Sequence, residues 1–86
     1  MKIKQKNKED FYRTEDLGLS TTLYTLNIPL ESIERSLNER KVTFVFSNEN
    51  NNLQQILQQY WRKEIRIEPQ TYFQSLRQLK NLIYSY

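Results

Sequence analysis

Residues 60–73 combine the side-chain types that could do chemistry in this chain. They read YWRKEIRIEPQTYF, so a pair of aromatic residues stands at each end and basic residues lie between the pairs. Bases of nucleic acids stack on aromatic rings, and phosphates pair with arginine and lysine. Two alternatives are open at this point: the rings form a nucleic-acid surface, or they fill the core of a small domain.

Helical spacing favours the core for these rings. The first aromatic pair, Tyr60 and Trp61, ends a helical repeat, and the second pair, Tyr72 and Phe73, begins another. We therefore predict that the four rings are mainly packed inside, with Tyr60 or Tyr72 showing an edge at a ligand surface. The apolar positions of the earlier helix are Leu53, Ile56, Leu57, Tyr60 and Trp61, and those of the later helix are Tyr72, Phe73, Leu76, Leu79, Ile83 and Tyr86.

Basic side chains near these rings are candidates for a patch that binds phosphates by charge, largely without sequence preference. The candidate nucleic-acid-binding residues are Arg13, Arg62, Lys63, Arg66, Arg77 and Lys80. The alternative is a set of solvated residues that pair with nearby acids. Arg77 has an alternative of its own, in which it bonds Asp16 or Glu15 and ties the last helix to the first.

The first nine residues alternate lysine with mostly polar residues. We expect residues 1–9 to form a disordered basic arm and residues 10–86 to form a single domain. The arm either follows a phosphate backbone or serves as a solubilising tail.

Catalytic and metal-binding groups are scarce. The chain has no cysteine and no histidine, which removes the usual nucleophile, general base and soft-metal ligands. One glycine leaves no phosphate-cradling loop. Glu15 and Asp16 suit the positive end of a helix dipole better than acid–base work. We predict a protein that is not an enzyme and uses no cofactor and no metal.

Composition also points to a compartment. The net charge is +3, a mild basic bias, and no apolar stretch approaches the roughly 20 residues that span a membrane. The basic start is not followed by the apolar region of a signal peptide. We expect a cytoplasmic protein without a membrane partner. Its richness in Asn, Gln, Lys, Ile and Tyr suggests an AT-rich genome, as in a virus or mobile element.

The order of elements predicts an α+β fold: helix, β-hairpin, helix, short edge strand, helix, with the helices packed on one face of a small sheet. Residues 14–16 mark the first helix start, and Asn27 can end that helix in a left-handed conformation. Residues 30–37 fit a helix or a strand, and we favour a hairpin of 31–36 with 41–46. Residues 64–68 fit a short edge strand or an extended connector. Pro69 opens the last helix.

Three segments carry a resemblance to a known family: FYRTEDLGLSTTLYTLN, KVTFVF and QQYWRKEIRIEPQTYFQSLRQLKNLIYS. In order and spacing they resemble a small uncharacterised family, known only as a domain of unknown function in bacterial, archaeal and viral genomes. The resemblance covers about residues 11–84. It implies a strand at 31–36 and brings no activity or site residue. Members often carry glycine after the first helix and in the hairpin turn, where this chain has Asn27 and residues 36–40.

The leading hypothesis is therefore a small non-enzymatic nucleic-acid-binding protein that contacts the phosphate backbone through the basic patch. The alternative is a protein–protein interaction module, either a homodimer or an inhibitor or adaptor of a host protein. The predicted edge strand and the apolar excess of the last helix favour this alternative.

Overall fold

The computed structural model describes residues 10–36, 38, 40–49 and 52–85 of the chain. The basic arm expected at residues 1–9 lies outside the described residues. Within the described ranges, none of the helices has the length and apolar character that crossing a lipid bilayer requires.

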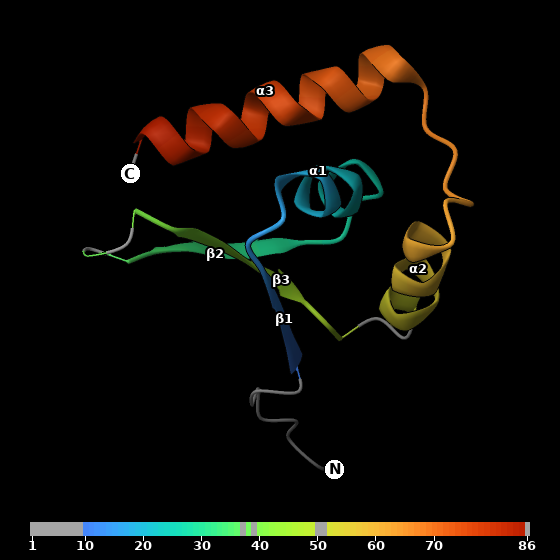
Figure 1. Cartoon of the computed structure of the whole chain (residues 1–86), viewed down its shortest axis with the longest axis horizontal. Coiled ribbons are helices and arrows are strands. Elements are labelled where there is room, and N and C mark those ends of the chain that lie inside the picture. Colours follow the sequence, from blue (N-terminus) through green and yellow to red (C-terminus); the bar gives the residue numbers. More distant parts are fainter. Residues whose placement is uncertain (1–9, 37, 39, 50–51, 86) are drawn as a thin grey trace, which may run out of the picture.

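Helices and strands of the described residues form an α+β domain, as predicted (Figure 1). The strands make one antiparallel sheet in the order β1–β3–β2, so β3 is central. In chain order the elements are β1 (Phe11–Thr14), α1 (Leu17–Thr25), β2 (Leu30–Arg35), β3 (Val42–Ser47), α2 (Asn52–Trp61) and α3 (Pro69–Ser85).

The β2–β3 hairpin confirms the strand interpretation of residues 31–36. Ile33 of β2 pairs with Phe44 of β3 in the middle of the hairpin. The turns use non-glycine residues in the left-handed region, with φ of 67° at Asn27 and 55° at Arg40. Asparagine tolerates this region well, so Asn27 ends α1 where the resemblance had suggested glycine.

Of the two alternatives for residues 64–68, the short edge strand is wrong and the extended connector is confirmed. These residues form an extended connector between α2 and α3, and β1 supplies the third strand of the sheet. β1 pairs with β3 from Phe11 opposite Ser47 to Thr14 opposite Phe44. Alternation of apolar and polar residues describes any extended chain with one covered side, so it does not show whether a partner strand lies beside it.

The first helix begins later than residues 14–16 suggested, because Thr14 belongs to β1. Asp16 is the N-cap of α1, and its Oδ1 accepts a hydrogen bond from the Leu19 N–H at 3.0 Å. The Thr14 hydroxyl accepts a hydrogen bond from the Asp16 N–H at 3.1 Å. A threonine followed by acids therefore marks a strand-to-helix junction here.

One apolar cluster joins the three helices to the same face of the sheet, as predicted. Phe44 and Phe46 are two residues apart on β3, so both side chains point to this face. The helices contribute Leu19 and Leu23 from α1, Leu53 and Leu57 from α2, and Leu79 from α3. The ribbon shows α1 between the sheet and α3 (Figure 1).

Because α1 lies between the sheet and α3, it buries polar as well as apolar residues. Ser20, Thr21 and Thr22 are buried together with Leu19 and Leu23. Each of the three hydroxyls donates a hydrogen bond to the carbonyl four residues earlier, at 2.8–2.9 Å. Because these bonds satisfy the buried hydroxyls within the helix, α1 can be covered on both sides without leaving these hydroxyls unpaired.

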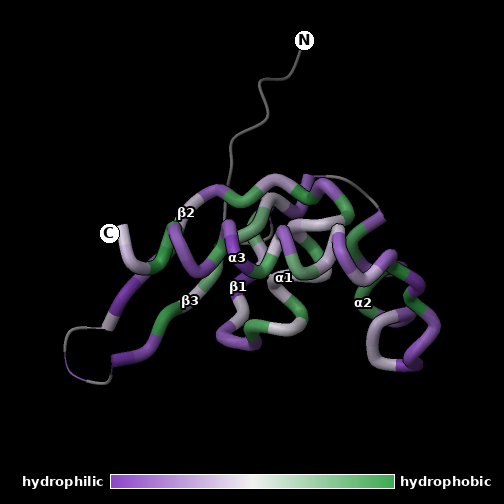
Figure 2. The backbone as a smooth tube through the Cα atoms, turned by 90° about the horizontal axis from the view of Figure 1, so that it is seen from above, coloured by the Kyte–Doolittle hydropathy of each residue, from purple (hydrophilic) through white to green (hydrophobic). Residues whose placement is uncertain are grey.

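α3 has a covered face and a free face. Seen from above, it crosses over α1, and its course alternates between hydrophilic and hydrophobic residues (Figure 2). Leu79 is fully buried, whereas Phe73 and Tyr84 are 56% and 81% exposed. At 3.6 residues per turn, Phe73 stands roughly 120° around the helix from Leu79. The prediction that Phe73 packs in the core is therefore wrong.

Trp61 also lies outside the core. Its side chain is 62% exposed, while Tyr60 and Tyr72 are partly buried against the core cluster or beside it. Trp61 is the last residue of α2, and the buried positions of that helix are Leu53 and Leu57. The helix end thus extends past the sheet, and the ring that the repeat assigned to the core faces solvent.

Candidate functional site

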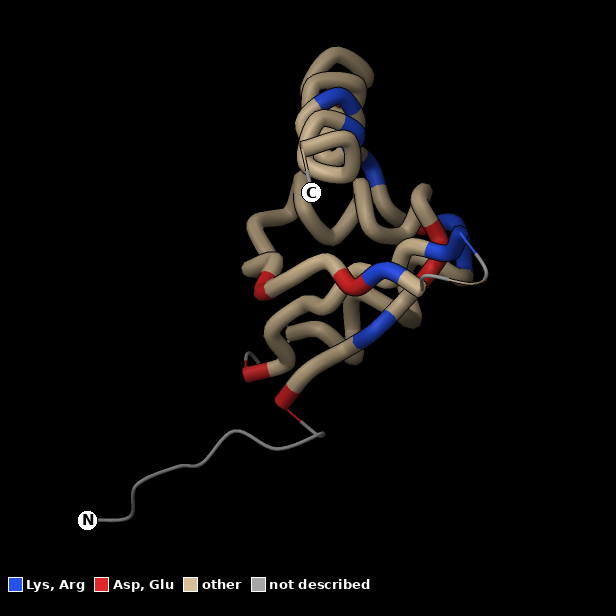
Figure 3. Tube along the Cα trace, turned by 90° about the vertical axis from the view of Figure 1, so that its left-hand side faces the viewer, with Lys and Arg blue, Asp and Glu red and all other residues tan. Residues whose placement is uncertain are grey.

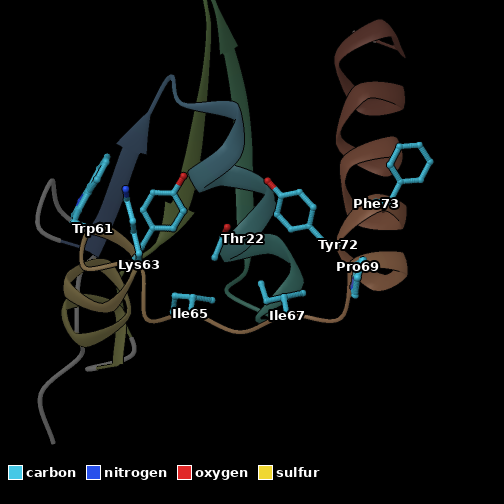
Figure 4. Close-up of a pocket in the computed structure, with 9 residues that line it drawn as sticks. Thr22, Trp61, Lys63, Ile65, Ile67, Pro69, Tyr72 and Phe73 are labelled. Atoms are coloured by element: carbon cyan, nitrogen blue, oxygen red, sulfur yellow. The ribbon is translucent and has the colours of Figure 1, made fainter.

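A groove of about 710 Å³ opens between α1, the end of α2, the connector and the start of α3 (Figure 4). We call it the aromatic groove. Its lining residues are Thr22, Tyr60, Trp61, Lys63, Ile65, Ile67, Pro69, Tyr72 and Phe73. Ligand pockets commonly have this size and this mainly apolar lining with a few polar groups. Residues 60–73 therefore provide most of the lining of a cavity.

The turn after α2 sets the course of the groove floor. The Lys63 N–H donates to the Tyr60 carbonyl at 3.0 Å, and the Glu64 N–H donates to the Gln59 carbonyl at 2.9 Å. Lys63 adopts a φ of 61° at the position where such turns favour glycine. The chain then runs extended along the floor, where Ile65 and Ile67 are partly buried.

Glu68 ends the floor by capping α3. Its carboxylate accepts hydrogen bonds from the Gln70 N–H at 3.0 Å and the Thr71 N–H at 2.8 Å. It also accepts one from the Thr71 hydroxyl at 3.0 Å. The backbone bonds from Gln70 and Thr71 lower the pKa of Glu68, because they favour the charged carboxylate.

Glu68→Gln should remove a contribution to stability that depends on pH. The lowered folded pKa means that the contribution is present above the unfolded carboxyl pKa, about 4.3, and disappears as pH falls through the folded pKa. Urea unfolding of the wild type and Glu68→Gln at neutral pH should give a higher midpoint for the wild type. The difference should shrink at about pH 3. An equal difference at both pH values would contradict a role for the charge.

Two tyrosine hydroxyls meet the start of α1 at Gly18. The Tyr72 hydroxyl donates to the Gly18 carbonyl at 3.4 Å, and the Tyr60 hydroxyl lies 3.1 Å from where a Cβ at Gly18 would stand. Burial raises the pKa of Tyr60, and the negative charge of Asp16 and then Tyr72 raise it further. Tyr60 is therefore a neutral hydrogen-bond donor near pH 7.

Trp61 lies at one end of the groove and packs against Tyr60. Its ring meets the ring of Tyr60 edge to face, with centroids 5.0 Å apart and an interplanar angle of 82°. The close-up shows Lys63 beside Trp61 and, across the groove, Tyr72 (Figure 4). Most of the indole surface remains accessible to a flat partner.

A second surface runs along the outer side of α3. We call it the α3 stripe, and its residues are Phe73, Arg77, Lys80 and Tyr84, all exposed. Spacings of four, three and four residues place them on one side of the helix. The Arg77 guanidinium lies over the Phe73 ring, 5.4 Å from its centroid. A smaller hollow of about 370 Å³ beside it is lined by Pro69, Gln70, Phe73, Gln74 and Arg77.

The six predicted basic residues do not share one element. Arg13 lies on β1, and its Nε is 3.3 Å from Glu34 Oε1 on β2, so the pair spans the central strand. Residues 62–66 belong to the turn and connector, where Arg66 donates to the carbonyls of Lys63 and Ile65 at 3.3 and 3.4 Å. Arg77 stacks on Phe73, and its proposed bond to Asp16 or Glu15 does not occur among the described contacts.

Charge is unevenly distributed over the fold. Figure 3 shows basic residues and no acidic residue along α3, whereas both signs occur around the strands. Residues 69–85 contain Arg77 and Lys80 and no aspartate or glutamate. Of the predicted patch, the fold therefore brings Lys63 to the aromatic groove and Arg77 and Lys80 to the α3 stripe, while the charge of Arg13 is balanced by Glu34.

The sequence reasoning missed the exposed faces of Trp61 and Phe73 and the groove between them, whereas Tyr84 belonged to the apolar excess of the last helix that favoured an interface. The 4–3–4 spacing of the α3 stripe was visible in the sequence, but an aromatic residue at its start was assigned to the core. The groove had no sequence signal, because its lining comes from α1, α2, the connector and α3.

Comparisons with known proteins place the chain in a family. No curated protein and no solved structure matches it. Residues 9–85 match the family described as a domain of unknown function (DUF5659), which covers nearly the whole chain and agrees with the resemblance noted from the sequence. The chain belongs to the DUF5659 family.

Proposed function

We propose that the domain is a non-enzymatic protein that binds single-stranded nucleic acid along the α3 stripe. The observation that carries this proposal is the exposed series of Phe73, Arg77, Lys80 and Tyr84 on a helix without acidic residues. Aromatic rings stack on the bases of a single strand, and the basic residues between them meet its phosphates. Phe73 and Tyr84 are about 16 Å apart along the helix axis, at about 1.5 Å per residue.

The proposal modifies the basic patch inferred from the sequence. Arg77 and Lys80 carry the phosphate contacts, Lys63, Arg62 and Arg66 extend them along the connector, and Arg13 has no part because Glu34 balances its charge. Exposed rings favour a single strand over a duplex, because paired bases do not offer their faces for stacking. The composition favours a role in the cytoplasm of a host, as a protein of a virus or mobile element.

Arg77→Ala with Lys80→Ala should weaken binding of a fluorescein-labelled oligothymidylate of about 15 nucleotides roughly tenfold at low salt. Each phosphate contact on a single strand adds about 0.7 to the slope of log K against log salt, so the slope should fall by about 1.4. Fluorescence anisotropy over a series of salt concentrations measures both quantities.

Arg35→Ala with Arg40→Ala is the matched control. It removes the same charge from exposed positions of the β2–β3 hairpin and should leave the affinity close to that of the wild type. Phe73→Leu should lower affinity without changing the salt slope, since it removes a stacking ring and no charge. Equal losses for the α3 and hairpin variants, or no binding by the wild type at low salt, would overturn the proposal.

A protein interface is the second candidate. The exposed side chains of Trp61, Phe73 and Tyr84 favour it, because aromatic residues and arginine dominate the binding energy of protein interfaces. A homodimer or a host protein would cover them. Light scattering that shows a dimer of the wild type and a monomer after Trp61→Ala or Phe73→Ala would support this candidate.

A further inference from the structure

We propose that the aromatic groove is a subsite for one nucleobase, which stacks on Trp61 while its phosphate pairs with Lys63. This inference rests on the proposed function and adds a second contact region to it. The α3 stripe holds the strand from outside, and the groove receives a base turned out of the strand. The two regions meet at Phe73, which belongs to both.

Trp61 has the properties of a stacking platform. Its edge-to-face contact with Tyr60, at 5.0 Å and 82°, favours one orientation of the indole, while 62% of the residue stays exposed. Indole offers a large flat π surface, and a base on such a ring contributes about 1–3 kcal/mol to affinity by alanine substitution. A core residue would hide this surface, and a freely rotating surface ring would lose entropy on binding.

Lys63 supplies the charge. Among the described residues that line the groove, Lys63 is the one with a charged side chain, so it is the group there that can pair with an anion. Its φ of 61° is unfavourable for a residue with a Cβ, and a glycine would close the α2 turn with less strain. Strained non-glycine residues that persist beside a cavity often have a role in binding. The figure shows the Lys63 side chain next to Trp61 (Figure 4).

Hydroxyl groups provide polar partners for the edge of a base. Thr22 and Tyr72 both donate to the Gly18 carbonyl, at 2.9 and 3.4 Å, so their oxygens still have lone pairs to accept hydrogen bonds. The Tyr60 hydroxyl makes no hydrogen bond within the described part of the chain and remains a donor. Ile65 and Ile67 form an apolar floor below these groups.

The test uses Trp61 as its own reporter, since it is the single tryptophan of the chain. The full chain is titrated with oligothymidylate and, as a control, with an abasic phosphodiester of the same length. Oligothymidylate should quench the tryptophan fluorescence, and the abasic strand should not, even where it binds. Binding of each strand is followed separately by anisotropy of a terminal dye.

Two substitutions of Lys63 separate binding from folding. Lys63→Gln should raise the concentration needed for quenching by about fivefold, because it removes one charge contact. Lys63→Gly should raise the urea midpoint of unfolding, since glycine relieves the backbone strain, and should weaken quenching to the same extent as Lys63→Gln. A variant such as Lys63→Gly that is more stable and yet binds more weakly is not expected if Lys63 has only a structural role.

The outcomes distinguish this inference from the proposed function. Strand binding by anisotropy without a change in Trp61 fluorescence overturns the groove subsite and leaves the α3 stripe in place. Equal quenching by the abasic strand also overturns it, because the groove then takes phosphate alone. Loss of binding in both measurements rejects the proposed function together with the subsite.

Discussion

Phe46→Ala should lower the free energy of unfolding by about 3–5 kcal/mol, as is usual when a buried phenylalanine is truncated. Phe46 is fully buried near the end of β3, the central strand, with Tyr12 of β1 and Leu30 of β2 as its neighbours in register. A domain of this length has a total stability of roughly 5–10 kcal/mol. The variant should therefore unfold at about half the urea concentration of the wild type, or be unfolded without denaturant.

Phe73→Ala is the matched control for this substitution. The same atoms are removed, but the side chain is 56% exposed and its main partner is the Arg77 guanidinium. We expect a loss below about 1 kcal/mol, as for most surface positions. Urea unfolding followed by far-UV circular dichroism compares the two variants directly. Similar losses at both positions would mean that Phe73 packs in the core and that the exposed α3 stripe does not exist.

The contrast between Phe46 and Phe73 also shows how far the sequence could predict this fold. Alternation along residues 42–46 placed Phe44 and Phe46 on one face of a strand, and the short polar link favoured a hairpin. The resemblance to a family decided between helix and strand for residues 31–36. The alternation and the link are local, so the sequence shows them. The helices α2 and α3 were predicted for the same reason, because their apolar repeats are long and regular.

The features that the sequence could not show are those that depend on which elements lie side by side in the fold. β1 has only four residues, and its partners on β3 are 30 to 36 positions away in the sequence, from Thr14 with Phe44 to Phe11 with Ser47, so no local pattern reveals the pairing. α1 is covered by the sheet below and α3 above, which buries Thr21 and Thr22 on sides that an amphipathic pattern leaves wet. The prediction of residues 64–68 as a strand failed because an extended connector has the same alternation.

The candidate site was predicted in part for a related reason. The residues that line the groove, within positions 60–73, were identified from composition and spacing. Whether each side chain lies in the core or on the surface was in part predicted wrongly. Trp61 and Phe73 were assigned to the core and are exposed, while Arg13 was assigned to a patch and is paired with Glu34. A helical repeat gives the direction of a side chain and not the point where the neighbouring layer ends. Trp61 is the last residue of α2, beyond the buried positions of that helix, whereas Phe73 lies on the side of α3 turned away from the buried Leu79.

Gly18→Ala should destabilise the domain by about 1 kcal/mol, although alanine in a helix usually stabilises by about 0.5–1 kcal/mol relative to glycine. A Cβ at this position would stand 3.1 Å from the Tyr60 hydroxyl oxygen and 3.3 Å from Asp16 Oδ1. Both distances are shorter than ordinary contacts of a methyl group. Asp16 also caps α1, so displacing its carboxylate would weaken the hydrogen bond to Leu19.

In a Tyr60→Phe background, Gly18→Ala should stabilise the domain instead of destabilising it. Without the hydroxyl, the shorter of the two close contacts disappears, and the helix preference for alanine can then be expressed. We expect Gly18→Ala to stabilise the Tyr60→Phe background slightly. The coupling between the two substitutions should be about 1–2 kcal/mol, within the range of residues in direct contact. Urea unfolding of the four proteins of the double-mutant cycle measures it.

Tyr72→Phe provides the control background, because the Tyr72 hydroxyl lies 3.8 Å from the same Cβ position, an ordinary contact distance. Gly18→Ala should therefore remain destabilising there. If both tyrosine variants rescued the alanine equally, the strain would not come from the Tyr60 hydroxyl. Rescue by Tyr60→Phe alone would show that this hydroxyl is held against the start of α1, and hence that the wall carrying Trp61 is fixed before any ligand enters the aromatic groove.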